Sequence, residues 1–159
     1  ILTFSDDYVD LLGGADSKAD AVARSTMLVE QFVLHAIEEE GAVLDLDGWN
    51  LPDKIMLHGH CHQKALVGTA NSMQALRSIP GCEAVEITAG CCGMAGSFGL
   101  EREHYDVSLQ IGEQALLPAI REEAGDFEVV SEGVSCRQQI EHGSGRQAKH
   151  LAEVLAEAI

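Results

Sequence analysis

Apolar residues follow helical spacing in some segments of the chain and form short continuous runs in others. In residues 17–40 they recur on one face of a helix. Ser17 and Asp20 form a capping box at the start of this segment, and Gly41 follows its last periodic residue. We therefore expect one helix over 17–40 that ends at Gly41.

Three short, mostly apolar segments have the length and composition of strands, at residues 55–58, 84–89 and 127–131. Helical spacing returns between them, over residues 64–77 and 100–121. Pro118 lies inside the second of these segments and is expected to bend it or to start a new turn. Ser144 and Gln147 form a further capping box, which predicts the start of a last helix.

The order of these segments favours a parallel sheet, because neighbouring parallel strands are usually joined by a helix. We therefore predict an α/β fold with a sheet of three or four parallel strands and helices packed on it. The length of 159 residues suits a single domain over 1–159. In such a fold, ligands bind at the carboxyl ends of the strands.

The charge balance excludes two classes of partner. The chain has 26 Asp and Glu against 10 Lys and Arg, a formal net charge of -16, and such a surface repels nucleic acid and anionic lipid. No apolar stretch approaches the roughly 20 residues that span a bilayer, so we expect no membrane insertion. The chain begins at Ile1 without a leader pattern, so we expect a cytoplasmic piece of a longer polypeptide.

Four of the five cysteines follow predicted strands. Cys61 comes after the first strand, Cys91 and Cys92 after the second, and Cys136 after the third. We expect these four thiols to meet at the carboxyl edge of the sheet and to ligate a metal centre rather than to form disulfides. Helix N-termini near Cys61 and Cys136 would lower the pKa of their thiols. Cys82 precedes the second strand, which places it at the opposite edge and outside the site.

The neighbours of these cysteines add candidate contacts. Gly93 opens a glycine-rich loop after the cysteine pair, and we expect it to let the backbone approach the bound cofactor closely. His60 and His62 flank Cys61, and we expect them to pack beside the centre rather than to ligate it. His58 shares a strand face with His60 and is expected to be a core residue with satisfied hydrogen bonds.

The cysteines alone leave two other interpretations open. Buried cysteines can cluster at strand ends as ordinary small core residues. Cys91 and Cys92 could instead form a thiol-disulfide pair, although a bond between adjacent cysteines requires strained backbone geometry.

Three segments of the sequence resemble the cysteine-rich CCG domain, at residues 59–66, 90–99 and 133–140. This domain occurs, usually as two tandem copies, in heterodisulfide reductase and in the iron-sulfur subunits of glycolate oxidase and anaerobic glycerol-3-phosphate dehydrogenase. The sequences Met-Ala-Gly-Ser-Phe-Gly and Ser-Cys-Arg-Gln-Gln are most similar to the C-terminal iron-sulfur regions of FAD-linked D-lactate or 2-hydroxyglutarate dehydrogenases.

The resemblance implies that residues 1–159 are the second of two CCG copies in a longer chain. Such a domain would carry electrons from reduced FAD through iron-sulfur centres while a 2-hydroxy acid such as D-lactate, glycolate or 2-hydroxyglutarate is oxidised. The implied partners are a flavin-containing dehydrogenase domain or subunit and the first CCG copy. The fragment itself would hold no complete active site.

One position departs from the family pattern, which commonly closes with Cys-x-x-Cys. Three residues after Cys136 this sequence has Gln139, so a fifth thiolate is missing. The four remaining thiolates match the ligand number of a [4Fe-4S] cluster, which is the cofactor that we predict. Four thiolates also suit zinc, so a structural zinc-binding interaction module without a redox role is the alternative.

Overall fold

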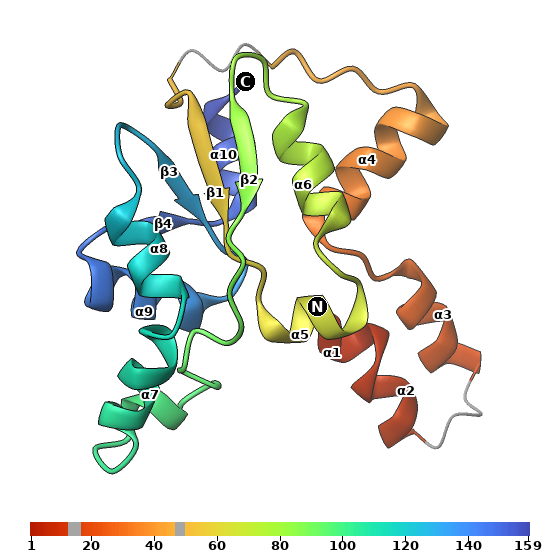
Figure 1. The fold of residues 1–159 in the computed structure, drawn as a ribbon. Coiled ribbons are helices and arrows are strands. Elements are labelled where there is room, and N and C mark those ends of the chain that lie inside the picture. The colour runs from red at the N-terminus through yellow and green to blue at the C-terminus, as the bar shows by residue number, and fades with distance from the viewer. Residues whose placement is uncertain (13–16, 47–49) are drawn as a thin grey trace.

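The described residues form one parallel sheet with helices on both of its faces. A computed structural model describes residues 1–12, 17–46 and 50–159 (Figure 1). Its strands are β1 (Lys54–Leu57), β2 (Glu83–Glu86), β3 (Glu128–Val130) and β4 (Ala148–Lys149), all parallel, in the order β2-β1-β3-β4. The predicted α/β fold is confirmed, and the part of the chain that is described has four strands in its sheet.

Helices precede, connect and follow these strands. They are α1 (Leu2–Ser5), α2 (Asp7–Leu11), α3 (Ser17–Ser25), α4 (Val29–Glu40), α5 (Cys61–Leu66), α6 (Ala70–Arg77), the 3-10 helix η1 (Phe98–Leu100), α7 (Tyr105–Gly112), α8 (Leu116–Glu122), α9 (Val134–Ser144) and α10 (Leu151–Glu157). Among the described residues, no helix has the length and apolar composition needed to cross a membrane.

The register aligns the carboxyl ends of the three longer strands. β1 lies between β2 and β3, and Leu57 pairs with Glu86 on one side and with Val130 on the other. The chain therefore leaves all three strands at one edge of the sheet (Figure 1). The segments that follow these three ends carry four of the cysteines, as predicted.

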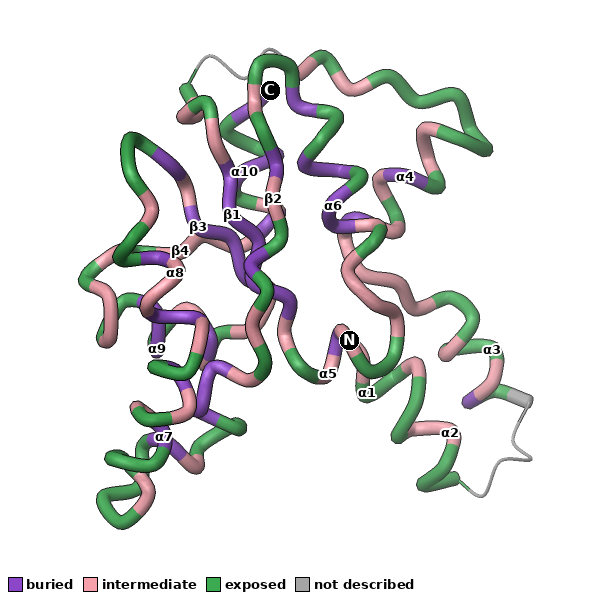
Figure 2. The backbone as a smooth tube through the Cα atoms, viewed as in Figure 1, coloured by how far each residue is buried: buried purple, intermediate pink, exposed green. Residues whose placement is uncertain are grey.

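Side chains alternate across β1 and fill an apolar core on each face. Ile55 and Leu57 belong to a cluster with residues of α6 and α10. Met56 belongs to a second cluster, which includes residues of α8 and α9 together with Cys92 and Cys136. Figure 2 shows the two central strands, β1 and β3, as largely buried between these layers. Because β1 is covered on both faces, residues 55–57 form a continuous apolar run rather than an alternating one.

The helix predicted over 17–40 is two helices, α3 and α4. Ser25 Oγ and Thr26 Oγ1 donate hydrogen bonds to the carbonyl oxygens of Ala21 and Val22, at 2.9 and 2.8 Å. Such side-chain bonds compete with the backbone ladder at a helix end. The chain is then extended at Leu28 before α4 begins. The side chain of Ser17, and with it the predicted capping box, lies outside the described residues.

Glycine and proline divide other predicted helices at the expected kinds of position. Gly41 ends α4 with a left-handed φ of 66°, as predicted. Gly68, at φ 72°, separates α5 from α6 within the helix predicted over 64–77. Pro118 lies in the first turn of α8, where a missing backbone N–H costs no helical hydrogen bond, so it accompanies the start of a new helix.

The capping box predicted at Ser144 is wrong. Ser144 ends α9, and its hydroxyl donates to the carbonyl oxygen of Ile140 at 2.6 Å. Gly145 follows with a left-handed φ of 75°, which ends the helix. The last helix starts later, where His150 Nδ1 accepts a hydrogen bond from the backbone N–H of Ala152 at 3.1 Å.

Candidate metal centre

The four predicted cysteines lie together at the carboxyl edge of the sheet. Cys61 is the first residue of α5, Cys136 lies in the first turn of α9, and the adjacent pair belongs to the loop after β2. Cys91 lies close enough to Cys61 to shift the pKa of the Cys61 thiol, and Cys92 and Cys136 lie close enough to shift the pKa of each other's thiols. Cys92 also acts electrostatically on Cys61, which joins the two pairs into one cluster.

The cluster has a buried end and an open end. Cys92 and Cys136 are 2% and 0% exposed, whereas Cys61 is exposed and Cys91 is half-buried. All the cysteines are free in the described structure, so Cys91 and Cys92 do not form a disulfide. Two thiols therefore lie within the apolar core, and the other two face toward solvent.

The pKa values of the thiols are shifted by neighbouring thiols and by burial. The neighbouring Cys136 thiol lowers the pKa of Cys92 to about 4, with His58 and the backbone at Met94 acting in the same direction against burial. The same contact raises the pKa of Cys136, and burial adds to the effect. Burial and the contact with Cys91 raise the pKa of Cys61. The pKa of both thiols is thus raised rather than lowered as predicted from the helix N-termini, because desolvation and neighbouring thiols disfavour the charged form.

Gly93 follows the cysteine pair in the loop after β2, and it packs closely against α7. Its φ is 98°, and a Cβ atom there would lie 2.0 Å from the carbonyl oxygen of Ser108. Its backbone N–H donates to Cys91 Sγ at 3.3 Å. The close backbone approach expected at Gly93 is therefore made with α7, while its N–H contacts one of the candidate ligands. Its assignment as a cofactor-binding residue stays a prediction.

Gly133 keeps space open beside the buried thiols. A Cβ atom at this position would lie 2.5 Å from His60 Cδ2 and 3.1 Å from Cys136 Sγ. His60 therefore packs against the start of α9, next to the cluster, as expected for a residue beside the centre. Burial lowers the pKa of His60, which favours its neutral form.

The surroundings of His58 differ from those predicted from the sequence. It is 0% exposed, and neither ring nitrogen has a hydrogen-bond partner among the described residues. One ligand atom each from His58, Cys92 and Cys136 lie within 4.8 Å of one another. The expectation of a core histidine with satisfied hydrogen bonds is therefore wrong. The available signal was its position directly after β1, at the same sheet edge as the cysteines.

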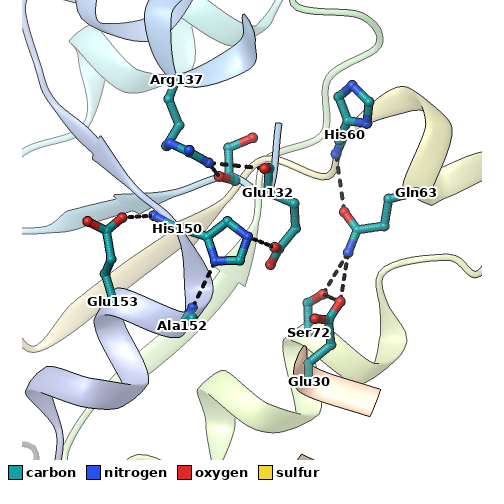
Figure 3. A network of polar contacts seen from close by, with 10 residues as sticks. Glu30, His60, Gln63, Ser72, Glu132, Arg137, His150, Ala152 and Glu153 are labelled. Atoms are coloured by element: carbon teal, nitrogen blue, oxygen red, sulfur yellow. Dashed lines mark hydrogen bonds and ion pairs between the residues drawn. The ribbon is translucent and has the colours of Figure 1, made fainter. Parts of the chain in front are cut away.

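A buried polar network holds the start of α5, where Cys61 lies (Figure 3). Gln63 Nε2 donates to Ser72 Oγ at 2.8 Å and to Glu30 Oε1 at 3.1 Å, and Ser72 Oγ also donates to Glu30 Oε1. The amide oxygen of Gln63 accepts the backbone N–H of His60 at 3.3 Å. The network thus ties α4 and α6 to the first turn of α5. Burial, with a contribution from the charge of Glu132, raises the pKa of Glu30.

A second set of contacts fixes the segment before Cys136 (Figure 3). Arg137 donates to the carbonyl oxygens of Ser131 and Glu132, at 2.8 and 3.0 Å. The carboxylate of Glu132 pairs with His150 Nε2 at 2.7 Å and raises the pKa of that imidazole. The loop between β3 and α9 is therefore held by charged groups on both sides.

Cys82 and Gln139 have other partners. Cys82 directly precedes β2, at the amino end of that strand, and its thiol contacts the carbonyl oxygen of Pro52 at 3.3 Å. Gln139 is buried, and its side-chain amide donates to the Ser108 carbonyl and hydroxyl oxygens, both at 3.1 Å. Gln139 therefore joins α9 to α7.

The residues present fit a thiophilic metal centre. Thiolate sulfur is the preferred donor for iron-sulfur clusters and for zinc, and four sulfurs lie near one another here, from the three segments that follow β1, β2 and β3. The unpartnered imidazole beside two of them adds a possible nitrogen donor. The identity of the ligands stays a prediction.

Comparison with known proteins gives relatives for this chain. It is 35% identical over 121 residues to a subunit of anaerobic glycerol-3-phosphate dehydrogenase of Escherichia coli (strain K12), a match that covers 76% of the chain and 30% of that protein. It is 30% identical over 161 residues to D-2-hydroxyglutarate dehydrogenase of Pantoea ananatis (strain AJ13355), covering 100% of the chain and 15% of the relative. The chain is similar to parts of dehydrogenases.

A third relative also matches most of the chain. Lactate utilization protein A of Lysinibacillus sphaericus (strain C3-41) is 26% identical over 147 residues, which cover 87% of the chain and 60% of that protein. The chain thus spans less than a third of the first two relatives. Neither a protein-family model nor a solved structure matches it at a significant level.

Proposed function

We propose that this chain is an iron-sulfur electron-transfer domain of a flavin-dependent oxidoreductase. Its ligands would be the thiolates of Cys61, Cys91, Cys92 and Cys136. The observation that carries the proposal is the gathering of these four thiols at one sheet edge, from the three segments that follow β1, β2 and β3. A [4Fe-4S] cluster bound by four thiolates supplies one-electron transfer.

Each part of the site has a distinct role in this proposal. The buried pair Cys92 and Cys136 would hold the centre in a medium of low dielectric constant, within the apolar cluster formed with α8 and α9. The exposed Cys61 would mark the side on which a redox partner approaches. The N–H of Gly93, directed at Cys91 Sγ, would stabilise negative charge on that sulfur.

The substrate and partners are proposed from the relatives. One relative is named a D-2-hydroxyglutarate dehydrogenase and another a lactate utilization protein. We infer that the parent enzyme oxidises a 2-hydroxy acid of the D-lactate, glycolate or 2-hydroxyglutarate type in the cytoplasm. FAD would be bound by another domain or subunit, and residues 1–159 would be the second CCG copy of that assembly.

Structural zinc is the second candidate, and one observation favours it. The ligand atoms of His58, Cys92 and Cys136 lie within 4.8 Å of one another. Zinc binds sulfur at about 2.3 Å and imidazole nitrogen at about 2.0 Å, so ligands of one ion are necessarily this close. A zinc module would be colourless and redox-silent, and a chelator would lower its melting temperature.

Anaerobic reconstitution tests the proposal. The purified chain is incubated with ferrous iron and sulfide under reducing conditions, and bound iron and sulfide are measured. We expect about four of each per chain, together with visible absorption that dithionite bleaches. The matched control is Cys82→Ser, which removes a thiol that lies away from the cluster and should leave the iron content unchanged.

The ligand variant is the double substitution Cys91→Ser with Cys92→Ser. We expect it to lose the bound iron and sulfide. The proposal is wrong if the unmodified chain incorporates no iron, or if the double variant incorporates as much as Cys82→Ser does.

A further inference from the structure

The imidazole of His58 is buried next to the candidate metal centre. Its backbone is fixed by the sheet, since its N–H donates to the carbonyl oxygen of Val130 at 2.8 Å. Its side chain is 0% exposed, and both ring nitrogens lack a hydrogen-bond partner in the parts of the chain that are described. Buried polar groups nearly always have a hydrogen-bond partner, because burial removes the hydrogen bonds that they would otherwise make to water.

The surroundings of the imidazole are sulfur atoms. One ligand atom each from His58, Cys92 and Cys136 lie within 4.8 Å of one another, and all three residues are buried. Neither sulfur is in hydrogen-bonding geometry with a ring nitrogen. An imidazole nitrogen and two thiols, all buried, are donors that soft and borderline metal ions accept.

The end of the neighbouring strand, β3, carries another buried polar atom without a hydrogen-bond partner among the described residues. Leu57 pairs with Val130, so Ser131 lies across from His58 at the ends of β1 and β3. Ser131 Oγ is also buried and unpartnered over the described ranges. Several polar atoms at the two strand ends therefore point to a group that the protein itself does not supply.

We propose that one ring nitrogen of His58 binds the metal of this centre directly, beside Cys92 and Cys136. The inference rests on the proposed function, because it requires that the cysteines hold a metal. Because a [4Fe-4S] cluster takes four protein ligands, the neutral imidazole of His58 would replace one of the four proposed thiolates. Gln139, which stands where the related pattern has a further cysteine, is committed to Ser108 on α7.

Isotope labelling tests direct ligation without relying on activity. The chain is produced with ¹⁵N-labelled histidine, reconstituted with ferrous iron and sulfide, reduced with dithionite, and examined by pulsed electron paramagnetic resonance. We expect a strong ¹⁵N coupling that is lost in His58→Ala. The matched control is His62→Ala, which alters a half-buried histidine of α5 next to Cys61 and should keep the coupling.

The outcomes separate the two proposals. Iron bound with only weak nitrogen coupling, as from a histidine that merely contacts a sulfur, overturns ligation by His58 and leaves the iron-sulfur function standing. A coupling that persists in His58→Ala also overturns it. A wild-type chain that binds no iron overturns both.

A second variant covers the case in which His58→Ala does not fold. In His58→Cys a thiolate takes the place of a neutral imidazole, and imidazole ligands raise cluster reduction potentials relative to thiolates. We therefore expect the midpoint potential of His58→Cys to be more negative than that of the unmodified chain. Equal potentials in His58→Cys and the unmodified chain contradict direct ligation.

Discussion

Replacing Gly93 by alanine should destabilise the fold more than the same replacement at Gly96. Both residues lie in the loop after β2 and both have positive φ, 98° for Gly93 and 71° for Gly96. The difference is space: a Cβ at Gly93 would lie 2.0 Å from the Ser108 carbonyl oxygen, whereas a Cβ at Gly96 meets nothing within 4 Å. The pair therefore separates a steric clash from backbone strain.

The magnitudes follow from these two terms. A left-handed conformation costs an L-residue about 1–2 kcal/mol, which both variants incur. Forcing a methyl group against packed atoms adds about 1–3 kcal/mol, and at Gly93 the obstructing atom is backbone of α7, which cannot rotate away. We expect Gly96→Ala to lose about 1–2 kcal/mol and Gly93→Ala about 2–5 kcal/mol.

Urea denaturation followed by far-ultraviolet circular dichroism measures the difference. With an m-value of about 2 kcal/mol per molar urea, the midpoint of Gly93→Ala should lie roughly 0.5–1.5 M below that of Gly96→Ala. Equal midpoints would show that the loop relaxes away from α7 freely. That result would refute the account of Gly93 as a packing residue.

Other predictions concern titration and core packing. Because burial raises the pKa of Glu30, the unfolded chain releases that proton first, and stability should fall as pH rises above about 4.3; Glu30→Gln should remove this part of the pH dependence of the urea midpoint. Glu132→Gln should lower the pKa of His150 in an NMR titration, and the stabilisation from this pair should be complete below about pH 6.5 and lost as pH rises through the raised pKa of His150; an unchanged titration would contradict the ion pair. Leu57→Ala, at a fully buried position, should cost about 2–5 kcal/mol in the same urea assay. Val43→Ala, at a position that is 89% exposed, should stay within about 0.5 kcal/mol, and similar losses in both would contradict the core assignment.

The strands and their common edge were predictable from the sequence. Residues 55–57 are apolar, and residues 127–130 are apolar except for Glu128, because strands covered on both faces need few polar side chains. Once these strands are taken as parallel, cysteines that follow them must meet at one edge. β4 was missed because two residues, Ala148 and Lys149, are too few to show a period.

The helix breaks and the histidine needed three-dimensional information. The hydroxyls of Ser25 and Thr26 act on carbonyl groups of the preceding turn, which apolar spacing does not record. Sequence patterns also cannot show whether a buried imidazole finds a partner, because candidate partners come from distant segments. His58 therefore looked like an ordinary core residue until the positions of Cys92 and Cys136 were known.

The sulfurs at the sheet edge come from three different crossover segments. Along the sequence, 29 residues lie between Cys61 and Cys91, and 43 lie between Cys92 and Cys136. An ion held by them would act as a cross-link, because closing such loops in an unfolded chain carries an entropic cost that grows with loop length. Removing the ion should therefore release all three crossovers together. In hydrogen exchange, their amides would lose protection as one unit, while β1 and β3 stay protected between the two apolar layers.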